Sequence, residues 1–103
     1  MAIEILLVDD NADIRNILNE LILDAGYKTR MAANYNQALS EIDKKMPDVA
    51  ILDVKLDKGD NDGIQLLSHI KSINKDVPVI MIAGHANIEM AISSLKHGAF
   101  EFV

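Results

Sequence analysis

The chain of 103 residues is long enough for one domain and too short for two. Half of the residues are hydrophobic, a quarter are charged and two are proline, a composition that favours a folded core over disorder. The sequence has no cysteine, which excludes disulfide scaffolds and thiolate metal sites, and its net charge of −6 argues against direct binding to nucleic acid or anionic membranes. With no apolar run long enough to span a bilayer and no signal peptide pattern, a cytoplasmic protein is expected.

Short apolar runs alternate with amphipathic stretches along the whole chain, which is typical of strands joined by helices. Residues 3–8 form a continuous apolar run, which indicates a strand covered on both faces. From Ala12 onward an apolar stripe at helical spacing predicts a first helix, and Gly26 is placed to end it. The stripe consists of Ile14, Ile17, Leu18, Leu21 and Ile22.

The next part of the chain repeats this order of strand and helix. Residues 28–32 predict a more exposed second strand, and Asn34 with Gln37 three positions later resembles the N-cap pair of a second helix. The stripe of this helix consists of Ala38, Leu39 and Ile42. Pro47 breaks the chain before the third strand, which is expected at residues 49–54 and to be buried.

The remaining residues predict two more helices and two more strands. A polar loop at residues 55–62 is expected to form a solvated turn, with Asp62 near the N-terminus of the third helix. The apolar positions of that helix are Ile64, Leu66, Leu67, Ile70 and Ile73. Residues 79–83 predict a fourth strand, residues 87–98 a fourth helix, and residues 100–103 the start of a fifth strand.

Parallel strands joined by right-handed crossovers form an open twisted sheet with helices on both faces. The expected fold is therefore an α/β, flavodoxin-like, doubly wound parallel sheet of five strands in the order 2-1-3-4-5. Ligands of such sheets bind beyond the carboxyl ends of the strands, where the first and third strands are neighbours. At this edge we expect Asp9, Asp10, Asp53, Ala83 and Gly84.

Three carboxylates at one edge of a sheet cannot all stay ionised unless a cation joins them. Oxygen ligands select magnesium, manganese or calcium, and a few carboxylates with room for water suit magnesium best. An ordinary structural interpretation is open for each residue alone. Asp10 or Asn11 could cap the first helix, and backbone amides could satisfy Asp53 at the end of its strand.

The whole chain resembles the receiver domain of two-component response regulators, with residues 1–103 as a single such domain. The resemblance rests on the pair Asp9-Asp10 after the first strand, Asp53 after the third, Gly63 after an acidic loop, and Gly98 before a final aromatic strand. Residues 84–89 and 95–100, together with the long loop before Gly63, are similar to the receivers of NtrX-type nitrogen-response regulators.

This resemblance implies a function and a set of roles. Asp53 would accept a phosphoryl group from a phosphohistidine of a sensor histidine kinase. Asp10, Asp53 and the backbone carbonyl of Lys55 would bind Mg²⁺ directly, with Mn²⁺ as a possible substitute, and Asp9 would bind it through a water. The chain would be a signalling domain rather than an enzyme, and it would switch a downstream transcriptional output.

The chain departs from the family pattern at two switch positions. Ala83 stands where receivers usually carry threonine or serine, and Phe102 stands at the switch aromatic, which is often tyrosine, so this pair forms no hydroxyl hydrogen bond. The chain also stops before the family's last helix, from which we expect an uncovered apolar flank and either self-association, such as a homodimer, or reduced stability.

Two other functions stay open at this point. A phosphorylation-independent receiver could serve as an interaction or dimerisation module, an alternative favoured by Ala83 and Phe102. An aspartate-nucleophile phosphatase would need a second aspartate where Asn11 stands. If the domain docks a partner, Glu89, Lys96 and Glu101 on the fourth helix and fifth strand are the candidate contact residues.

Overall fold

The computed structural model describes residues 3–54, 56, 62–82, 98 and 101–102. The described residues form a parallel five-stranded sheet and three helices. The strands are β1 (Glu4–Val8), β2 (Lys28–Ala32), β3 (Val49–Asp53), β4 (Val79–Ile82) and β5 (Glu101–Phe102). The helices are α1 (Ala12–Asp24), α2 (Tyr35–Lys44) and α3 (Asp62–Ile73).

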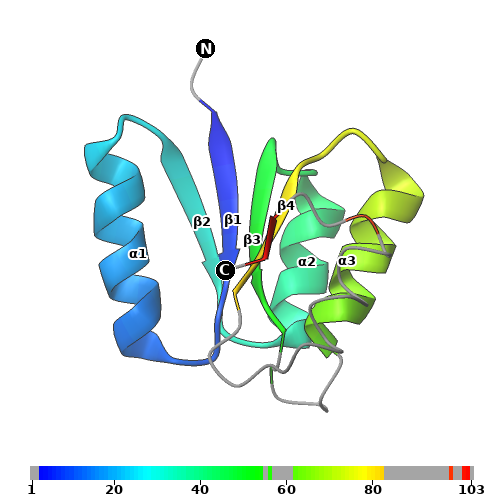
Figure 1. The fold of residues 1–103 in the computed structure, drawn as a ribbon, viewed down its shortest axis with the longest axis horizontal. Coiled ribbons are helices and arrows are strands. Elements are labelled where there is room, and N and C mark those ends of the chain that lie inside the picture. Colours follow the sequence, from blue (N-terminus) through cyan, green and yellow to red (C-terminus); the bar gives the residue numbers. More distant parts are fainter. Residues whose placement is uncertain (1–2, 55, 57–61, 83–97, 99–100, 103) are drawn as a thin grey trace.

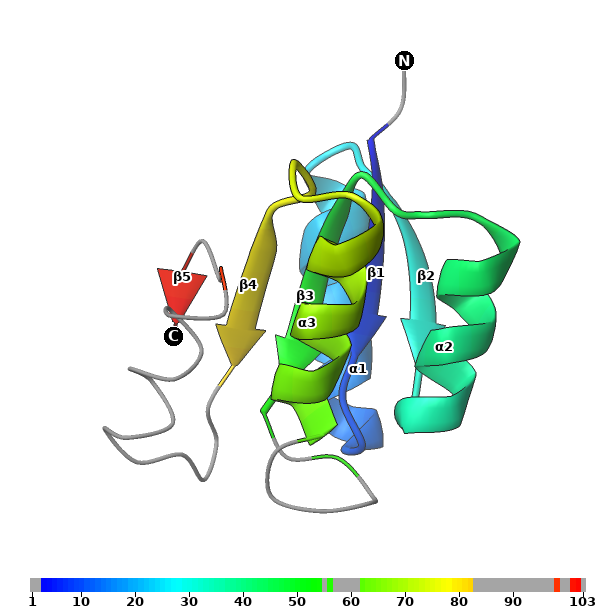
Figure 2. The same ribbon diagram turned by 90° about the vertical axis from the view of Figure 1, so that its right-hand side faces the viewer.

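The sheet order is β2-β1-β3-β4-β5, which confirms the predicted doubly wound topology. Helix α1 covers one face of the sheet, and α2 and α3 cover the other (Figures 1 and 2). The predicted fourth helix lies outside the described residues. The strand boundaries agree with the prediction to within a residue or two, with Val54 just after β3 rather than inside it.

Alternate residues of the central strands face the two helical layers, because side chains of a strand point to opposite faces in turn. The larger core lies on the side of α2 and α3, where Leu6 and Val8 of β1 pack with Leu66 and Ile70 of α3. The smaller core lies under α1 and contains Ile5, Leu7 and Ile22. Strand β1 is therefore covered on both faces, as its continuous apolar run predicted.

Two capping predictions are confirmed. The side chain of Asn34 accepts the backbone N–H of Gln37 at 2.8 Å, and the side chain of Gln37 accepts the N–H of Ala33 at 2.8 Å. Gly26 follows the end of α1 with a φ of +94°, a left-handed conformation that favours glycine. The backbone N–H of Tyr27 then donates to the carbonyl of Ile22.

The apolar stripe of α1 is only partly covered, in agreement with the uncovered apolar flank expected from the sequence. Ile22 is buried and Leu18 is partly buried, but the side chains of Ile17 and Leu21 are 59% and 61% exposed, and Ile14 is also exposed. Among the described residues no other helix lies on the α1 face of the sheet, so none of the described helices covers the flank of the stripe. Ile73, at the last turn of α3, is also exposed rather than part of the core.

Candidate metal centre

The carboxyl ends of β1 and β3 lie side by side at the sheet edge. The two strands are parallel neighbours, and Val8 pairs with Leu52. Asp9 and Asp53, the residues that follow this pair, are therefore placed at the same edge. Each of Asp9, Asp10 and Asp53 offers one carboxylate oxygen, and these three oxygens all lie within 4.8 Å of one another. The structure thus brings Asp53 to the adjacent pair Asp9 and Asp10, from which it is remote in sequence.

Asp9 is the buried member of the trio, with 1% of its surface exposed. Its Oδ1 accepts the backbone N–H of Asn11 at 2.9 Å. Burial is the main reason that the pKa of Asp9 lies above its ordinary value, and the charge of Asp10 raises it further. The hydrogen bond from Asn11 and the charge of Arg15 act in the opposite direction. The raised pKa of Asp9 therefore reflects mainly its burial, with a smaller contribution from the neighbouring charge of Asp10.

The cap of α1 is provided by Asn11. Its side-chain oxygen accepts the backbone N–H groups of Asp13 at 2.9 Å and Ile14 at 3.2 Å. The cap accounts for Asn11 and leaves the exposed Asp10 as a member of the carboxylate group rather than a helix cap. Asn11 stands where an aspartate-nucleophile phosphatase would need its second aspartate, and its side chain caps α1 instead.

Arg15 is a residue of this site that the sequence reasoning missed. Its Nη1 donates a hydrogen bond to the backbone carbonyl of Asp9 at 2.7 Å, which brings a positive charge to the acidic edge. A backbone carbonyl can belong to any residue, so no sequence motif marks such a contact. The helical spacing from Asn11 to Arg15, one turn into α1, is the signal that was available.

The start of α3 packs directly on the end of β3. Asp62 is the first residue of α3, as predicted, but it is 2% exposed and so does not belong to a solvated turn. Its Oδ1 accepts the backbone N–H of Leu56 at 2.6 Å. The next residue, Gly63, donates its N–H to the carbonyl of Val54 at 3.0 Å. Burial follows because this helix begins against the strand end rather than out in solvent.

Several predicted site residues lie outside the described residues: Lys55, Ala83, Gly84, Glu89 and Lys96. For Glu101 and Phe102 the structure describes the backbone, which pairs with Ile80 and Met81 of β4. The predicted roles of these seven residues stay predictions.

The carboxylate trio fits the coordination preferences of a small divalent cation. Oxygens bound directly to one Mg²⁺ at about 2.0–2.1 Å can lie at most about 4.2 Å apart. The three carboxylate oxygens lie up to 4.8 Å apart. They can therefore bind one Mg²⁺ if one carboxylate binds through a water, or if the carboxylates move slightly closer together on binding. The all-oxygen donor set selects hard cations such as Mg²⁺ and Mn²⁺.

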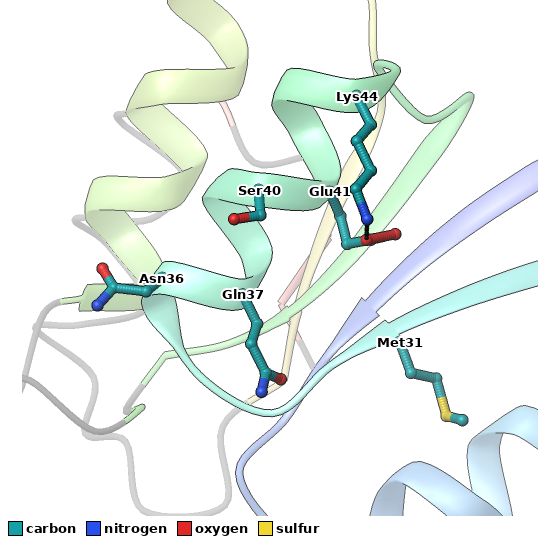
Figure 3. Close-up of a pocket in the computed structure, with 6 residues that line it drawn as sticks. All are labelled: Met31, Asn36, Gln37, Ser40, Glu41 and Lys44. Carbon is teal, nitrogen blue, oxygen red and sulfur yellow. Dashed lines mark hydrogen bonds and ion pairs between the residues drawn. The ribbon is translucent and has the colours of Figure 1, made fainter.

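A separate pocket of about 330 Å³ lies beside α2 and is lined by none of the three carboxylates. Its lining residues are Met31, Asn36, Gln37, Ser40, Glu41 and Lys44 (Figure 3). The two charged residues of the pocket form an ion pair with each other at 3.2 Å. This pairing leaves the pocket without a convergent charged group, and we assign no function to it.

No helix in the described part of the chain is both long and apolar enough to cross a membrane. This agrees with the short apolar runs of the sequence.

Comparison with known proteins places the chain in a family. Residues 5–103 match the model of the response regulator receiver domain. The nitrogen assimilation regulatory protein NtrX of Azorhizobium caulinodans is 42% identical over 103 residues, which cover all of this chain and 23% of that protein. The chain therefore spans less than a quarter of the length of this relative.

Solved structures agree with this assignment. A crystal structure of NtrX from Brucella abortus matches with a TM-score of 0.89 and 41% identity, covering 100% of this chain and 23% of that one. A response regulator from Burkholderia pseudomallei, solved with a phosphorylated aspartic acid, a calcium ion and citrate, matches with a TM-score of 0.87 and 25% identity over 97% of this chain and 58% of that one. The chain belongs to the response regulator receiver domain family, is similar to NtrX-type regulators, and is a phosphoacceptor domain of two-component signalling.

Proposed function

We propose that Asp53 is the phosphoacceptor of this domain and that it receives the phosphoryl group from a phosphohistidine of a sensor histidine kinase. The observation that carries this proposal is the meeting of Asp9, Asp10 and Asp53 within 4.8 Å at the ends of two neighbouring strands. Asp53 is the partly buried residue that ends β3, and it is within reach of both other carboxylates.

The transfer is a displacement at phosphorus. A carboxylate oxygen of Asp53 forms the new P–O bond while the P–N bond of the phosphohistidine breaks. The electron pair of that bond returns to the imidazole nitrogen, and the imidazole leaves as the neutral ring, with its proton either already on the other ring nitrogen or taken from solvent. The product is an acyl phosphate on Asp53. No oxidant or further reactant is needed.

We propose that Asp10, Asp53 and the backbone carbonyl of Lys55 hold Mg²⁺ or Mn²⁺ directly and that Asp9 holds it through a water. When bound, the cation neutralises the anionic groups that must approach one another. The placement of the three carboxylate oxygens within 4.8 Å of one another supports this assignment. The calcium ion and phosphorylated aspartic acid in the Burkholderia pseudomallei relative support it as well.

In this proposal Asp9 and Arg15 support the site without touching the phosphoryl group. The buried carboxylate of Asp9 is oriented by the N–H of Asn11. Arg15 holds the backbone of Asp9 and supplies positive charge beside the site. Both contacts fix the end of β1 before any ligand arrives, so little reorganisation is needed on binding.

We further propose that phosphorylation acts through the segment that follows β4 and through β5. Gly84 would give the first segment its freedom to rearrange, while Ala83 and Phe102 would relay the change without the hydroxyl pair usual in receivers. Glu89, Lys96 and Glu101 would form the face that meets a partner or a second copy of the chain. The output would be transcriptional, in keeping with the regulatory role in the name of the NtrX relative, and the location would be cytoplasmic.

The test is intact mass spectrometry after incubation with Mg²⁺ and acetyl phosphate. The wild type is expected to gain one phosphoryl group, Asp53→Asn none, and the control Asp43→Asn, at an exposed position on α2, the same gain as wild type. An undiminished gain in Asp53→Asn would contradict the assignment. Failure of the wild type to gain mass with metal bound would instead favour the phosphorylation-independent interaction module.

A further inference from the structure

We propose that Asp62 and Gly63 are positioning residues that set the divalent-cation affinity of the site by holding the backbone at and just after Asp53, the last residue of β3. We call this pair, at the start of α3, the α3 clamp. The inference rests on the proposed metal site and goes beyond it, because neither residue belongs to the carboxylate trio.

The first arm of the α3 clamp is the carboxylate of Asp62. A buried carboxylate is costly unless its charge is used, and here Oδ1 accepts the backbone N–H of Leu56 at 2.6 Å. The N-terminus of α3 favours a negative charge at this position. The hydrogen bond joins the first residue of the helix to the backbone only three positions after Asp53 and closes the loop between them at its base.

The N–H of Leu56 shares a planar peptide group with the carbonyl of residue 55. Any contact that fixes the direction of this N–H therefore also limits the direction of that carbonyl, which is the proposed backbone ligand of the cation. A carboxylate that accepts from the N–H also polarises the peptide group and makes its carbonyl oxygen a better donor to a cation. Asp62 would thus act on the metal through one peptide group.

The second arm is Gly63. A Cβ atom at this residue would lie 1.9 Å from the backbone oxygen of Asp53 and 2.8 Å from its carbonyl carbon. Both atoms belong to the backbone, so no flexible side chain could move aside. The N–H of Gly63 also donates to the carbonyl of Val54 at 3.0 Å. The helix therefore rests on the backbone of Asp53, and any side chain at residue 63 must displace the acceptor or the helix.

Gly26 offers a matched control for these variants. It has a φ of +94°, so alanine there is strained, but a Cβ would meet nothing within 4 Å. Gly26→Ala is thus expected to lower stability by straining the end of α1 without moving the strand ends of the site. The Gly26→Ala variant therefore shows whether a loss of stability alone lowers the affinity for divalent cations.

The experiment is titration of the full chain with Mg²⁺, and separately with Mn²⁺, by calorimetry, alongside melting temperatures measured without metal. Asp62→Ala and Gly63→Ala are expected to weaken divalent binding about 10-fold or more, the range found when groups that orient metal ligands are removed. Asp62→Asn, which keeps an oxygen acceptor, is expected to retain more affinity than Asp62→Ala. Gly26→Ala is expected to bind divalent cations as tightly as the wild type, even if its melting temperature falls as far as that of Asp62→Ala.

Wild-type affinity in Asp62→Ala would overturn the α3 clamp and leave the proposed function intact. Equal losses of affinity in Gly26→Ala and Asp62→Ala at matched stability would also overturn it. If Gly63→Ala does not fold, the comparison of Asp62→Asn with Asp62→Ala decides. Absence of any divalent binding by the wild type would overturn the proposed metal site and the clamp together.

Discussion

The guanidinium of Arg15 donates to the backbone carbonyl of Asp9 at 2.7 Å and so holds a positive charge beside the carboxylate trio. This charge lowers the pKa of Asp9, against the larger effect of burial that raises it. The arginine therefore moderates the electrostatic strain of the metal-free site.

Arg15→Met should raise the pKa of Asp9 further, because it removes the opposing charge while keeping an apolar chain of similar length. The measurement is a pH titration of the carboxyl carbon of Asp9 by NMR without divalent cations. Lys28→Met, at an exposed position of β2, is the control and should leave the titration of Asp9 unchanged. A pKa of Asp9 that stays constant or falls in Arg15→Met would contradict this role.

Asp9→Asn should make the metal-free protein more stable near neutral pH. The pKa of Asp9 is raised on folding, so its contribution to stability is full at low pH and is lost as pH rises through the folded-state pKa. Asparagine keeps the acceptor for Asn11 without the charge, so the variant should unfold at a higher urea concentration and a higher temperature than the wild type.

The check is urea unfolding of both proteins from pH 3 to 8, in which the difference should grow with pH. Saturating Mg²⁺ should reduce or reverse the advantage, because the wild type binds the cation better and gains more stability from it. A variant that is less stable than wild type at pH 7 without metal would be evidence against a strained Asp9.

Asn11→Ala should cost about 1 kcal/mol of stability, because the N–H groups of Asp13 and Ile14 lose their cap. Asn11→Ser, which can cap, should recover most of the loss. The N–H that Asn11 donates to Asp9 belongs to the backbone, so Mg²⁺ affinity should change little in either variant. Urea unfolding measures the stability and calorimetric titration measures the Mg²⁺ affinity. A large loss of Mg²⁺ affinity in Asn11→Ser would contradict the expectation that the Asn11 side chain acts on stability alone.

Residues 1–103 should self-associate at high concentration through the exposed flank of α1, where Ile17 and Leu21 face solvent. The double variant Ile17→Lys with Leu21→Lys should shift light scattering toward the monomer. Leu23→Lys, at another exposed position of α1, is the control and should have a smaller effect. A wild type that is monodisperse and monomeric at high concentration would contradict the prediction.

The hydrophobic pattern sufficed to predict the sheet and the meeting of the three carboxylates. Continuous apolar runs identify β1 and β3 as central strands, and parallel topology then places Asp9 and Asp53 at one edge. Local cap signals are equally direct, as Asn34 with Gln37 shows. These features depend on spacing along the chain, which is visible in the sequence.

The burial of Asp62, and which residues of α1 form its uncovered flank, could not be predicted in the same way. Asp62 is buried because Gly63 lets α3 rest on the backbone of Asp53, a contact between segments that spacing does not reveal. Ile17 belongs to a regular apolar stripe, but whether a stripe is covered depends on which elements pack beside it. Arg15 was missed because its partner is a backbone atom.

Site mapping of the phosphoryl group tests the central assignment most directly. After incubation with Mg²⁺ and acetyl phosphate, borohydride reduction converts an aspartyl phosphate to homoserine, which peptide mass spectrometry locates. The account predicts homoserine at residue 53 and at none of the other aspartates. Homoserine at residue 9 or 10 in place of residue 53, or at no residue in protein that binds Mg²⁺, would contradict it.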